Sequence, residues 1–406
     1  MDNSNSISWP ELELDNLRAI KVLGKGAMGT VFLVYHKSND PTARSPFALK
    51  VLDKSSLPLK PHADRRARWE ISVLNRLQQP NHHQFLPYLL GVSDTDRYLC
   101  WATNYCPGGD LNQLRYRQFD RVFSPTVIRF YLAEIVCAIE KLHSMGLVYR
   151  DLKPENILIQ HSGHVTLTDF DLSRFLPSKK VETLLFNSDS EIEKPKPHGR
   201  TNYLKRFVNL KNKNNGKGLK KARSARVSPV SRRNPNFTNE RSNSFVGTEE
   251  YVAPEIIRGD GHEFAVDWWA LGVLCYELLY GTTPFRGNNR KETFRRILMM
   301  EPEFIGKPNA LTDLIKKLLA KDPTRRLGYL RGASEIKEHE FFKGLSWDLL
   351  TEVLRPPFLP SRDETEELTK GGMEIDEYFQ KLKAPPSPLW SPSIDEGRRS
   401  VSLTEF

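Results

Sequence analysis

Two short polar motifs near the middle of the chain restrict its fold more than any other feature. The first, Tyr-Arg-Asp-Leu-Lys-Pro-Glu-Asn, occupies 149–156, and the second, Asp-Phe-Asp, occupies 169–171. Between them, the aliphatic stretches 157–159 and 165–167 flank a His-Ser-Gly turn, which predicts a β-hairpin. The hairpin would bring the two motifs together, so the chain must fold around one polar site.

The residue types in these motifs are those that move a phosphoryl group. Asp151 can accept the proton of a hydroxyl group, and Lys153 can neutralise a γ-phosphate. Asn156 and Asp169 offer the amide and carboxylate oxygens that Mg²⁺ prefers. We therefore predict that these four residues form the catalytic and metal-binding centre.

Composition excludes several classes of protein. A chain of 406 residues with 39% hydrophobic residues can build two lobes with cores of their own. Its longest apolar run, 268–279, contains Glu277 and is too short to span a bilayer. The 4 cysteines have neither paired nor metal-ligand spacing, so we expect reduced core thiols. These features indicate a soluble intracellular protein without a structural metal.

Most of the positive charge lies in one segment. The net charge is +10, but 176–243 alone holds 17 Lys and Arg against 5 Asp and Glu. Few apolar residues and no periodicity mean that burial cannot offset its ordering entropy, so we predict a disordered insertion. Its charge can attract an anionic membrane or a nuclear import receptor, although a solvated loop is an equal alternative. Because it lacks interleaved aromatic residues, no nucleic acid is expected.

A glycine-rich segment near the N-terminus predicts a flap over phosphate groups. It follows the apolar stretch 20–23 and leads into the β-branched and aromatic stretch 30–35. A dinucleotide-binding fold would instead require a helix after the glycines and an acid about 20 residues on, where this chain has Lys50. Glycine lets backbone N–H groups approach phosphate oxygens. The predicted nucleotide contacts from the flap are Leu23, Gly24, Lys25, Gly26, Ala27, Met28, Gly29 and Val31.

Lys50 and Glu70 are predicted to act together on the nucleotide. Lys50 lies in the apolar stretch 47–51, and Glu70 lies within a segment with the apolar spacing of an amphipathic helix. Taken alone, either residue is more often a solvated surface charge. Their strand and helix contexts favour an ion pair that holds Lys50 against the phosphates. The apolar positions of the predicted helix are Trp69, Val73, Leu74 and Leu77.

The stretch 98–102 predicts a buried strand that leads into Pro-Gly-Gly at 107–109, which indicates a hinge. The hinge backbone can pair with adenine, so Thr103 and Tyr105 are predicted to contact the nucleotide. From the Ser-Pro pair at 124–125, which is typical of a helix start, the chain is predicted to be mostly helical.

Taken together, these motifs resemble those of eukaryotic protein kinases over about 17–342. The series continues with Ala-Pro-Glu at 253–255, Asp-Trp-Trp-Ala-Leu-Gly at 267–272 and Arg-Arg-Leu-Gly at 325–328. Within the kinases, Tyr-Arg-Asp, Ser-Phe-Val-Gly-Thr at 244–248, Pro-Pro-Phe-Leu-Pro at 356–360 and the final Leu-Thr-Glu-Phe resemble the AGC group. Asp-Phe-Asp with a long insertion resembles the plant AGC subfamily VIII, most closely its UNICORN and OXI branch.

The resemblance implies the α+β, bilobal protein-kinase fold. An N-terminal extension at 1–16 would precede a small β-rich lobe at 17–103. A larger helical lobe at 104–342 would contain the insertion at 176–243. An AGC C-terminal tail would occupy 343–406.

The resemblance also implies a serine/threonine protein kinase that uses ATP and Mg²⁺, with a signalling role in plant growth or stress. Asp151 would orient the hydroxyl, Lys153 would neutralise the γ-phosphate, and Asn156 and Asp169 would bind the metal. Ala48 would join the nucleotide pocket, and Glu255 would pair with a buried Arg326. Asp110, Glu155 and Glu277 would hold Arg or Lys upstream of the target hydroxyl, and Thr248 would be a further substrate-binding residue.

Two regulatory features follow from the same resemblance. Phosphate on Ser244 would be bound by Arg150 and would order the activation loop, although an inert loop serine is the alternative. Leu403 and Phe406 would fill a groove beside the Glu70 helix or dock an upstream phosphoinositide-dependent kinase. The tail segment 375–379 would return an aromatic side chain to the ATP site.

Asp171 departs from the family pattern, because it stands where most kinases have glycine. Its side chain would restrict the backbone freedom of the loop, and a pseudokinase scaffold is the alternative function. Every catalytic position is filled, however, so we expect an active, monomeric enzyme. We expect it in the cytoplasm and nucleus, with peripheral association at the plasma membrane.

Overall fold

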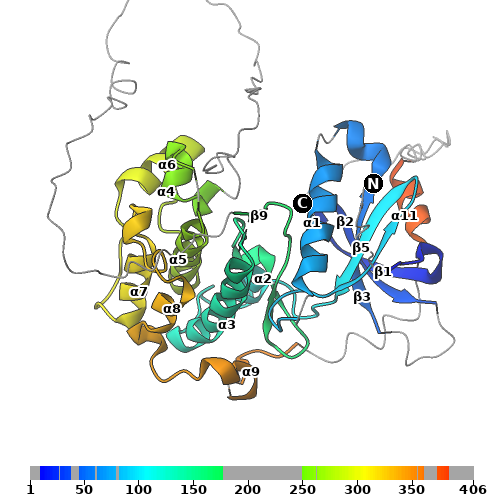
Figure 1. Cartoon of the computed structure of the whole chain (residues 1–406). Coiled ribbons are helices and arrows are strands. Elements are labelled where there is room, and N and C mark those ends of the chain that lie inside the picture. Colours follow the sequence, from blue (N-terminus) through cyan, green and yellow to red (C-terminus); the bar gives the residue numbers. More distant parts are fainter. Residues whose placement is uncertain are drawn as a thin grey trace, which may run out of the picture. The chain divides into compact units, whose positions relative to one another are not determined.

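The computed structural model describes residues 10–26, 28–37, 45–59, 62–78, 82–176, 249–261, 263–353, 355–360 and 373–383. The predicted insertion beyond Leu176 lies outside the described residues. So do five of the predicted site residues, namely Ala27, Ser244, Thr248, Leu403 and Phe406. The described part contains a β-rich lobe and a helical lobe (Figure 1), as the predicted α+β architecture requires.

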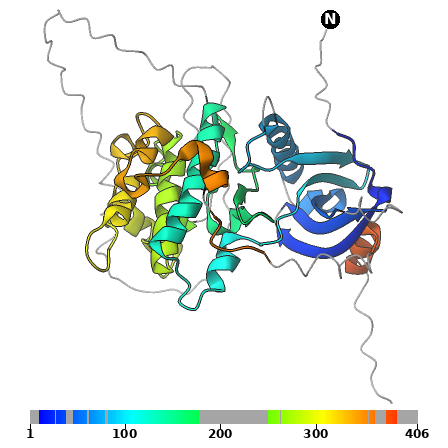
Figure 2. The same ribbon diagram turned by 90° about the horizontal axis from the view of Figure 1, so that it is seen from below.

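The β-rich lobe is built on an antiparallel sheet of five strands in the order β1-β2-β3-β5-β4. Helix α1 and helix α11 cover its two opposite faces (Figures 1 and 2). Short 3₁₀ turns precede β1 and follow β3. The elements of this lobe are β1 (Leu17–Gly26), β2 (Gly29–His36), β3 (Phe47–Asp53), α1 (Ala63–Leu77), β4 (Leu89–Asp94), β5 (Tyr98–Asn104) and α11 (Ile375–Lys383).

Helix α1 forms where the apolar spacing predicted it. Ala67, Ile71 and Leu74 follow the helical repeat, and each is no more than 2% exposed. Burying an Ile or Leu side chain of this kind stabilises a fold by about 1.5–3 kcal/mol. This face fixes the rotation of α1 and places Glu70, which is 3% exposed, toward the interior of the molecule.

Helix α11 occupies a different place from the one that the sequence predicted. Phe379 packs against Phe32 and Tyr98, with ring centroids 6.0 and 5.3 Å apart. These residues belong to the hydrophobic cluster between α11 and the sheet, so the expected return of an aromatic to the ATP site is wrong. The backbone is anchored too, since the Ala19 and Met373 amides each donate to the other's carbonyl oxygen at 3.0 and 2.9 Å.

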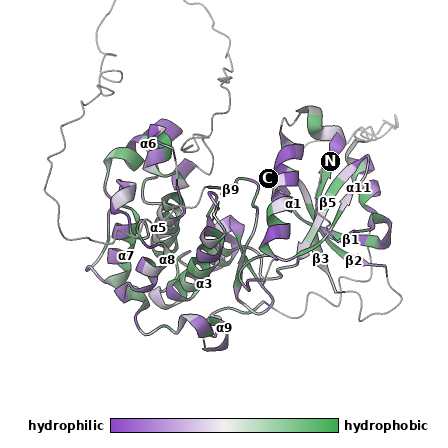
Figure 3. Ribbon diagram, viewed as in Figure 1, coloured by the Kyte–Doolittle hydropathy of each residue, from purple (hydrophilic) through white to green (hydrophobic). Residues whose placement is uncertain are grey.

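The helical lobe is organised around α3 and α5, which contact each other and are largely buried. Ser124 accepts a hydrogen bond from the Val127 amide, and Pro125 occupies the first turn, as the sequence predicted. The outer helices carry both hydrophilic and hydrophobic residues (Figure 3). The helices of this lobe are α2 (Leu111–Tyr116), α3 (Pro125–Ser144), α4 (Pro254–Arg258), α5 (Ala265–Tyr280), α6 (Arg290–Met299), α7 (Ala310–Leu318), α8 (Ala333–Lys337) and α9 (Leu350–Val353).

The predicted hairpin between the two polar motifs is present. Strand β7 (Ile157–Ile159) pairs antiparallel with β8 (Val165–Leu167), in the register Ile157↔Leu167. A second pair joins β6 (Leu147–Val148), just before the first motif, to β9 (Arg174–Phe175), just after the second. Both ends of each motif are therefore tied to neighbouring strands.

Two expectations from composition can be checked on the described residues. All 4 cysteines are buried and free of disulfide bonds. Burial raises the pKa of the Cys275 thiol, as expected for an inert core thiol. Among the helices that the structure describes, none is both long and apolar enough to cross a membrane.

Candidate active site

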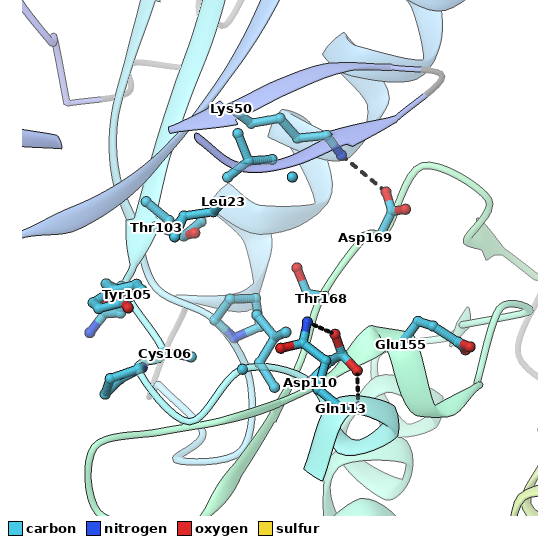
Figure 4. Close-up of a pocket in the computed structure, with 18 of the residues that line it drawn as sticks. Leu23, Lys50, Thr103, Tyr105, Cys106, Asp110, Gln113, Glu155, Thr168 and Asp169 are labelled. Atoms are coloured by element: carbon cyan, nitrogen blue, oxygen red, sulfur yellow. Dashed lines mark hydrogen bonds and ion pairs between the residues drawn. The ribbon is translucent and has the colours of Figure 1, made fainter. Parts of the chain in front are cut away.

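A cleft with a volume of about 420 Å³ lies between the sheet and the helical lobe (Figure 4). Its apolar lining suits a flat aromatic base, and the charged side chains of Lys50, Glu70 and Asp169 lie together at what we call its polar end. Strands β1, β2, β3 and β5, the hinge after β5, and the 169–171 motif all contribute to it. The predicted nucleotide residues that line the cleft are Leu23, Gly24, Val31, Ala48, Lys50, Glu70, Thr103 and Tyr105.

The tip of the glycine flap contributes differently from the prediction. Gly26 and Gly29 pair at the turn between β1 and β2, and a Cβ on Gly29 would lie 2.3 Å from the Val51 carbonyl oxygen. Lys25 places its ammonium 5.3 Å from the centre of the Tyr378 ring. Met28 is 5% exposed and belongs to the main hydrophobic core. These four residues do not line the cleft, and for Met28 the apolar core is the reason.

Lys50 connects the sheet, α1 and the second motif. Its Nζ donates to Glu70 Oε2 at 2.8 Å and to Asp169 Oδ1 at 3.0 Å, so the predicted ion pair is present. Burial acts to lower the pKa of Lys50, but the charges of Glu70 and Asp169 outweigh it and raise that pKa. Lys50 is therefore a fixed positive charge at the polar end of the cleft.

The first motif forms a compact hydrogen-bonded group. Lys153 Nζ and Asn156 Nδ2 each donate to Asp151 Oδ2 at 2.8 Å, and Nδ2 also donates to the Asp151 carbonyl oxygen at 2.9 Å. Burial raises the pKa of the Asp151 carboxyl, and the hydrogen bond from Lys153 offsets part of that effect. A carboxylate with a raised pKa is better suited to take a proton from a hydroxyl.

The loop of the first motif is positioned by Asp267, a buried acid to which the sequence analysis gives no role. Asp267, fully buried in α5, accepts hydrogen bonds from the Tyr149 and Arg150 amides at 2.8 and 2.7 Å. Its Oδ2 also lies 2.8 Å from His143 Nε2. Arg150 has a positive φ of 73°, which an L residue adopts only at some cost. The two charge-assisted hydrogen bonds stabilise that conformation.

The donor set at the polar end of the cleft fits a nucleoside triphosphate with a divalent ion. Both hydrogen bonds of Asn156 Nδ2 go to Asp151, which leaves the amide oxygen of Asn156 as the atom that can bind a cation. Asp169 uses Oδ1 for Lys50, and its side chain is 36% exposed. One amide oxygen and one carboxylate are typical of sites that hold Mg²⁺ together with substrate phosphates.

The predicted substrate acids differ in their surroundings. Asp110 and Glu155 line the cleft. Asp110 caps α2 by accepting the Gln113 amide at 2.8 Å, and Glu155 accepts Asn112 Nδ2 at 3.0 Å. Glu277 lies away from the cleft lining, where it accepts bonds from Arg115 at 2.9 Å and from Tyr251 at 2.5 Å. A substrate cation would have to share Glu277 with Arg115.

Several cleft residues were not anticipated. Leu158 lines the cleft from β7, and Thr168 and Cys106 line it from the residue before the second motif and from the segment after β5 (Figure 4). The sequence predicts Leu158 within the hairpin, and only the alternation of side chains along a strand indicates that it turns away from its neighbours and toward the cleft. Lys21 and Arg117 also line the cleft, and nothing in their sequence context distinguished them from surface charges.

Comparison with known proteins agrees with this geometry. The family model described as the protein kinase domain matches residues 17–190 and 231–342. The chain belongs to the protein kinase family. The unmatched stretch of the kinase, 191–230, falls within the range that the sequence predicts as an insertion.

Curated relatives cover nearly the whole kinase. It is 59% identical over 393 residues to the serine/threonine-protein kinase UCNL of Arabidopsis thaliana, which spans 95% of this chain and 94% of the relative. It is 58% identical to the serine/threonine-protein kinase UCN of the same plant, over 95% of each chain. It is 43% identical to OXI1, over 92% of this chain and 86% of the relative. The predicted membership of the plant AGC serine/threonine kinases is thereby confirmed.

Proposed function

We propose that the kinase transfers the γ-phosphate of ATP to serine and threonine hydroxyls of protein substrates, with Mg²⁺ as the divalent ion. The observation that carries the proposal is the Lys50 bridge, which joins Glu70 at 2.8 Å and Asp169 at 3.0 Å. This bridge lies in the same cleft as the predicted substrate-binding residues Asp110 and Glu155. The match to serine/threonine-protein kinases supports the choice of acceptor.

Catalysis would rest on positioning and charge rather than on covalent chemistry. When bound, ATP supplies the phosphoryl group and Mg²⁺ neutralises the negative charge of its phosphates. Lys50 would hold the phosphates, and Asn156 and Asp169 would hold the metal. Asp151 would accept the proton of the substrate hydroxyl at a carboxylate oxygen, and Lys153 Nζ, which already bonds to Asp151, would lie beside the γ-phosphate.

The test is radiolabel transfer from ATP to serine residues of a generic basic protein. Asp169→Asn removes the carboxylate from the metal site and from Lys50, so labelling should be abolished. The variant should remain folded, because Asn is close to Asp in size and the Asp169 side chain is 36% exposed. Equal labelling by the variant and the wild type would refute the proposed function.

A preference for Arg or Lys upstream of the target hydroxyl is also proposed. Its support is that Asp110 and Glu155 line the cleft, with Glu277 as a further predicted contact. A degenerate peptide library should show enrichment of basic residues at upstream positions. Uniform use of the library would contradict the preference.

Activation by phosphate on Ser244 is proposed from the positive charge around Arg150. Burial, and then the like charge of Arg174, lower the pKa of Arg150 to about 10, and a phosphate would relieve that repulsion. Ser244→Ala should lower the rate of phosphoryl transfer. Equal activity of wild-type protein that carries no phosphate at Ser244 would contradict this proposal.

We also propose a docking role for Leu403 and Phe406. They would fill a groove near α1, or they would dock an upstream phosphoinositide-dependent kinase. Phe406→Ala should weaken capture of that kinase.

We also propose residence in the cytoplasm and nucleus with peripheral plasma-membrane association, and signalling in growth or stress. The support is the basic segment 176–243, with 17 Lys and Arg, which can bind an anionic membrane or an import receptor. Deletion of 179–233 should shift the distribution of a fluorescent fusion while sparing peptide phosphorylation. An unchanged distribution would exclude this role for the segment.

A further inference from the structure

The acid that replaces glycine in the second motif has a cationic partner on α1. Arg66 Nη2 donates a hydrogen bond to Asp171 Oδ2 and forms an ion pair with it. The Asp171 side chain is 3% exposed, whereas that of Arg66 is 37% exposed. A carboxylate this deeply buried is strongly unfavourable without a cation. The ion pair with Arg66 therefore compensates the burial of the Asp171 carboxylate.

Arg66 lies on the same face of α1 as the residue that holds Lys50. Arg66 and Glu70 are four residues apart, so their side chains lie one above the other on the helix. Between them in the sequence, Trp69 donates its Nε1–H to Ser173 Oγ at 3.2 Å. One face of α1 thus contacts the second motif and the residues after it through Arg66, Trp69 and, by way of Lys50, Glu70.

The backbone conformation at Asp171 is one that residues other than glycine adopt without strain. Among the described residues, the non-glycine positions with positive φ include Asp169, at 58°, but not Asp171. A side chain at 171 is therefore unstrained. The substitution adds an interaction with α1 without a backbone penalty.

The segment that α1 grips continues directly to the catalytic loop. Phe175 pairs with Leu147, and Arg174 with Val148, just before the first motif. The Phe175 ring also lies 5.6 Å from Trp69, edge to face, and 4.7 Å from the Arg76 guanidinium. A shift of α1 would consequently displace residues next to both polar motifs.

We propose that Asp171 and Arg66 are positioning residues for phosphoryl transfer, because their ion pair fixes α1 against the 169–171 motif and keeps Glu70 and Lys50 aligned with Asp169. This assignment rests on the function proposed above. It gives the unusual acid a role that a flexible glycine cannot fill. Two ion pairs therefore join this face of α1 to Lys50 and to the second motif, one at Glu70 and one a helical turn earlier at Arg66.

The test is a double-mutant cycle on the full-length kinase, assayed well below its unfolding temperature. Arg66→Ala leaves the Asp171 carboxylate buried and unpaired beside Asp169, so kcat should fall about tenfold, equivalent to ~1.4 kcal/mol, with the KM for the acceptor peptide unchanged. Asp171→Gly should cause a smaller loss, because Arg66 can turn to solvent. The double variant should fall only to the level of Asp171→Gly, because the cost of an unpaired carboxylate is removed while the loss of positioning remains.

Two further variants separate positioning from mere stability. Arg66→Lys keeps the charge and should retain most of the wild-type kcat. Arg68→Ala is the matched control, because Arg68 lies on the same helix but pairs with Asp64 and Asp94 rather than with the motif. Its kcat should equal that of the wild type.

Three results would contradict the assignment of Arg66 and Asp171 as positioning residues. Strictly additive losses in the cycle would show that the two residues do not act as a pair. A fall in melting temperature with unchanged kcat in Arg66→Ala would show a purely structural role. Absence of phosphoryl transfer by the wild type would instead refute the proposed function, and the assignment with it.

Discussion

Asp267 shows how a single buried residue can fix the conformation of the catalytic loop. It is 0% exposed and accepts the amides of Tyr149 and Arg150. A positive φ at a residue such as Arg150 costs on the order of 1–3 kcal/mol, and hydrogen bonds to a charged acceptor are worth ~1.5–3 kcal/mol each. The bonds thus outweigh the strain. Sequence reasoning could not assign this role, because the partners are 117 and 118 residues away along the chain.

The bidentate pair between Arg326 and Glu255 gives the first prediction at this scale. Arg326 donates to the two carboxylate oxygens at 2.6 and 2.9 Å and is 1% exposed. Glu255→Ala leaves the guanidinium buried and unpaired, so the free energy of unfolding should fall by about 3–5 kcal/mol, as measured by urea denaturation. The matched control is Glu338→Ala, which breaks a solvent-exposed pair with Arg331 and should change little. Equal effects would contradict the structural role.

Lys321 predicts how stability depends on pH. Burial lowers the pKa of its ammonium to about 8, and Nζ lies 3.6 Å from the centre of the Phe285 ring without a hydrogen-bond partner among the described residues. Between about pH 8 and the ordinary value of 10.5, the unfolded chain keeps this proton and the folded one releases it. The contribution of Lys321 to the free energy of unfolding therefore rises with pH in that window.

The measurement compares wild type with Lys321→Met, which cannot titrate. Urea unfolding at pH 7.5 and pH 9.5 should show a larger gain, or a smaller loss, in the wild type than in the variant. The difference between the two proteins isolates Lys321 from the other groups that titrate in this range. The same change in both proteins would show that Lys321 keeps its ordinary pKa.

At the scale of elements, the sequence predicted those helices and turns whose formation depends on neighbouring residues in the chain. The start of α3 follows from Ser124 and Pro125, and the β7–β8 hairpin follows from two aliphatic stretches around a glycine turn. Helix α11 shows the limit. Its sequence is amphipathic, but which face of which lobe it covers depends on the hydrophobic cluster offered by Phe32 and Tyr98, which no local pattern encodes.

Phe379 tests the anchoring of α11. It is 7% exposed within the cluster between α11 and the sheet. Phe379→Ala removes an aromatic ring from a packed site, so the free energy of unfolding should fall by about 3 kcal/mol, seen as a lower melting temperature in calorimetry. Phe119→Ala is the control, since Phe119 is fully exposed. A Phe379 variant as stable as the Phe119 variant would mean that α11 does not pack on the sheet in solution.

At the scale of the whole molecule, the sequence predicted the chemistry of the site better than its assembly. Lys50, Glu70 and Asp169 were each identified from their motifs, and they meet although Lys50 and Asp169 are 119 residues apart. The ion pair between Arg66 and Asp171 was not foreseen, because Arg66 lies among other arginines in a polar stretch. Met28 was predicted to contact the nucleotide because it lies in the glycine-rich motif, but its apolar side chain packs in the hydrophobic core instead.

The most direct test of the account is single-turnover transfer of phosphate from saturating ATP and Mg²⁺ by wild type and Asp151→Asn. Asn preserves the size of the side chain but cannot accept the hydroxyl proton as a carboxylate does. The transfer rate should fall by about 10²–10⁴-fold, while the dissociation constant for ATP stays near that of the wild type. Asp348→Asn, at an exposed position of the helical lobe, should transfer at the wild-type rate. Transfer by Asp151→Asn at the wild-type rate would contradict the account.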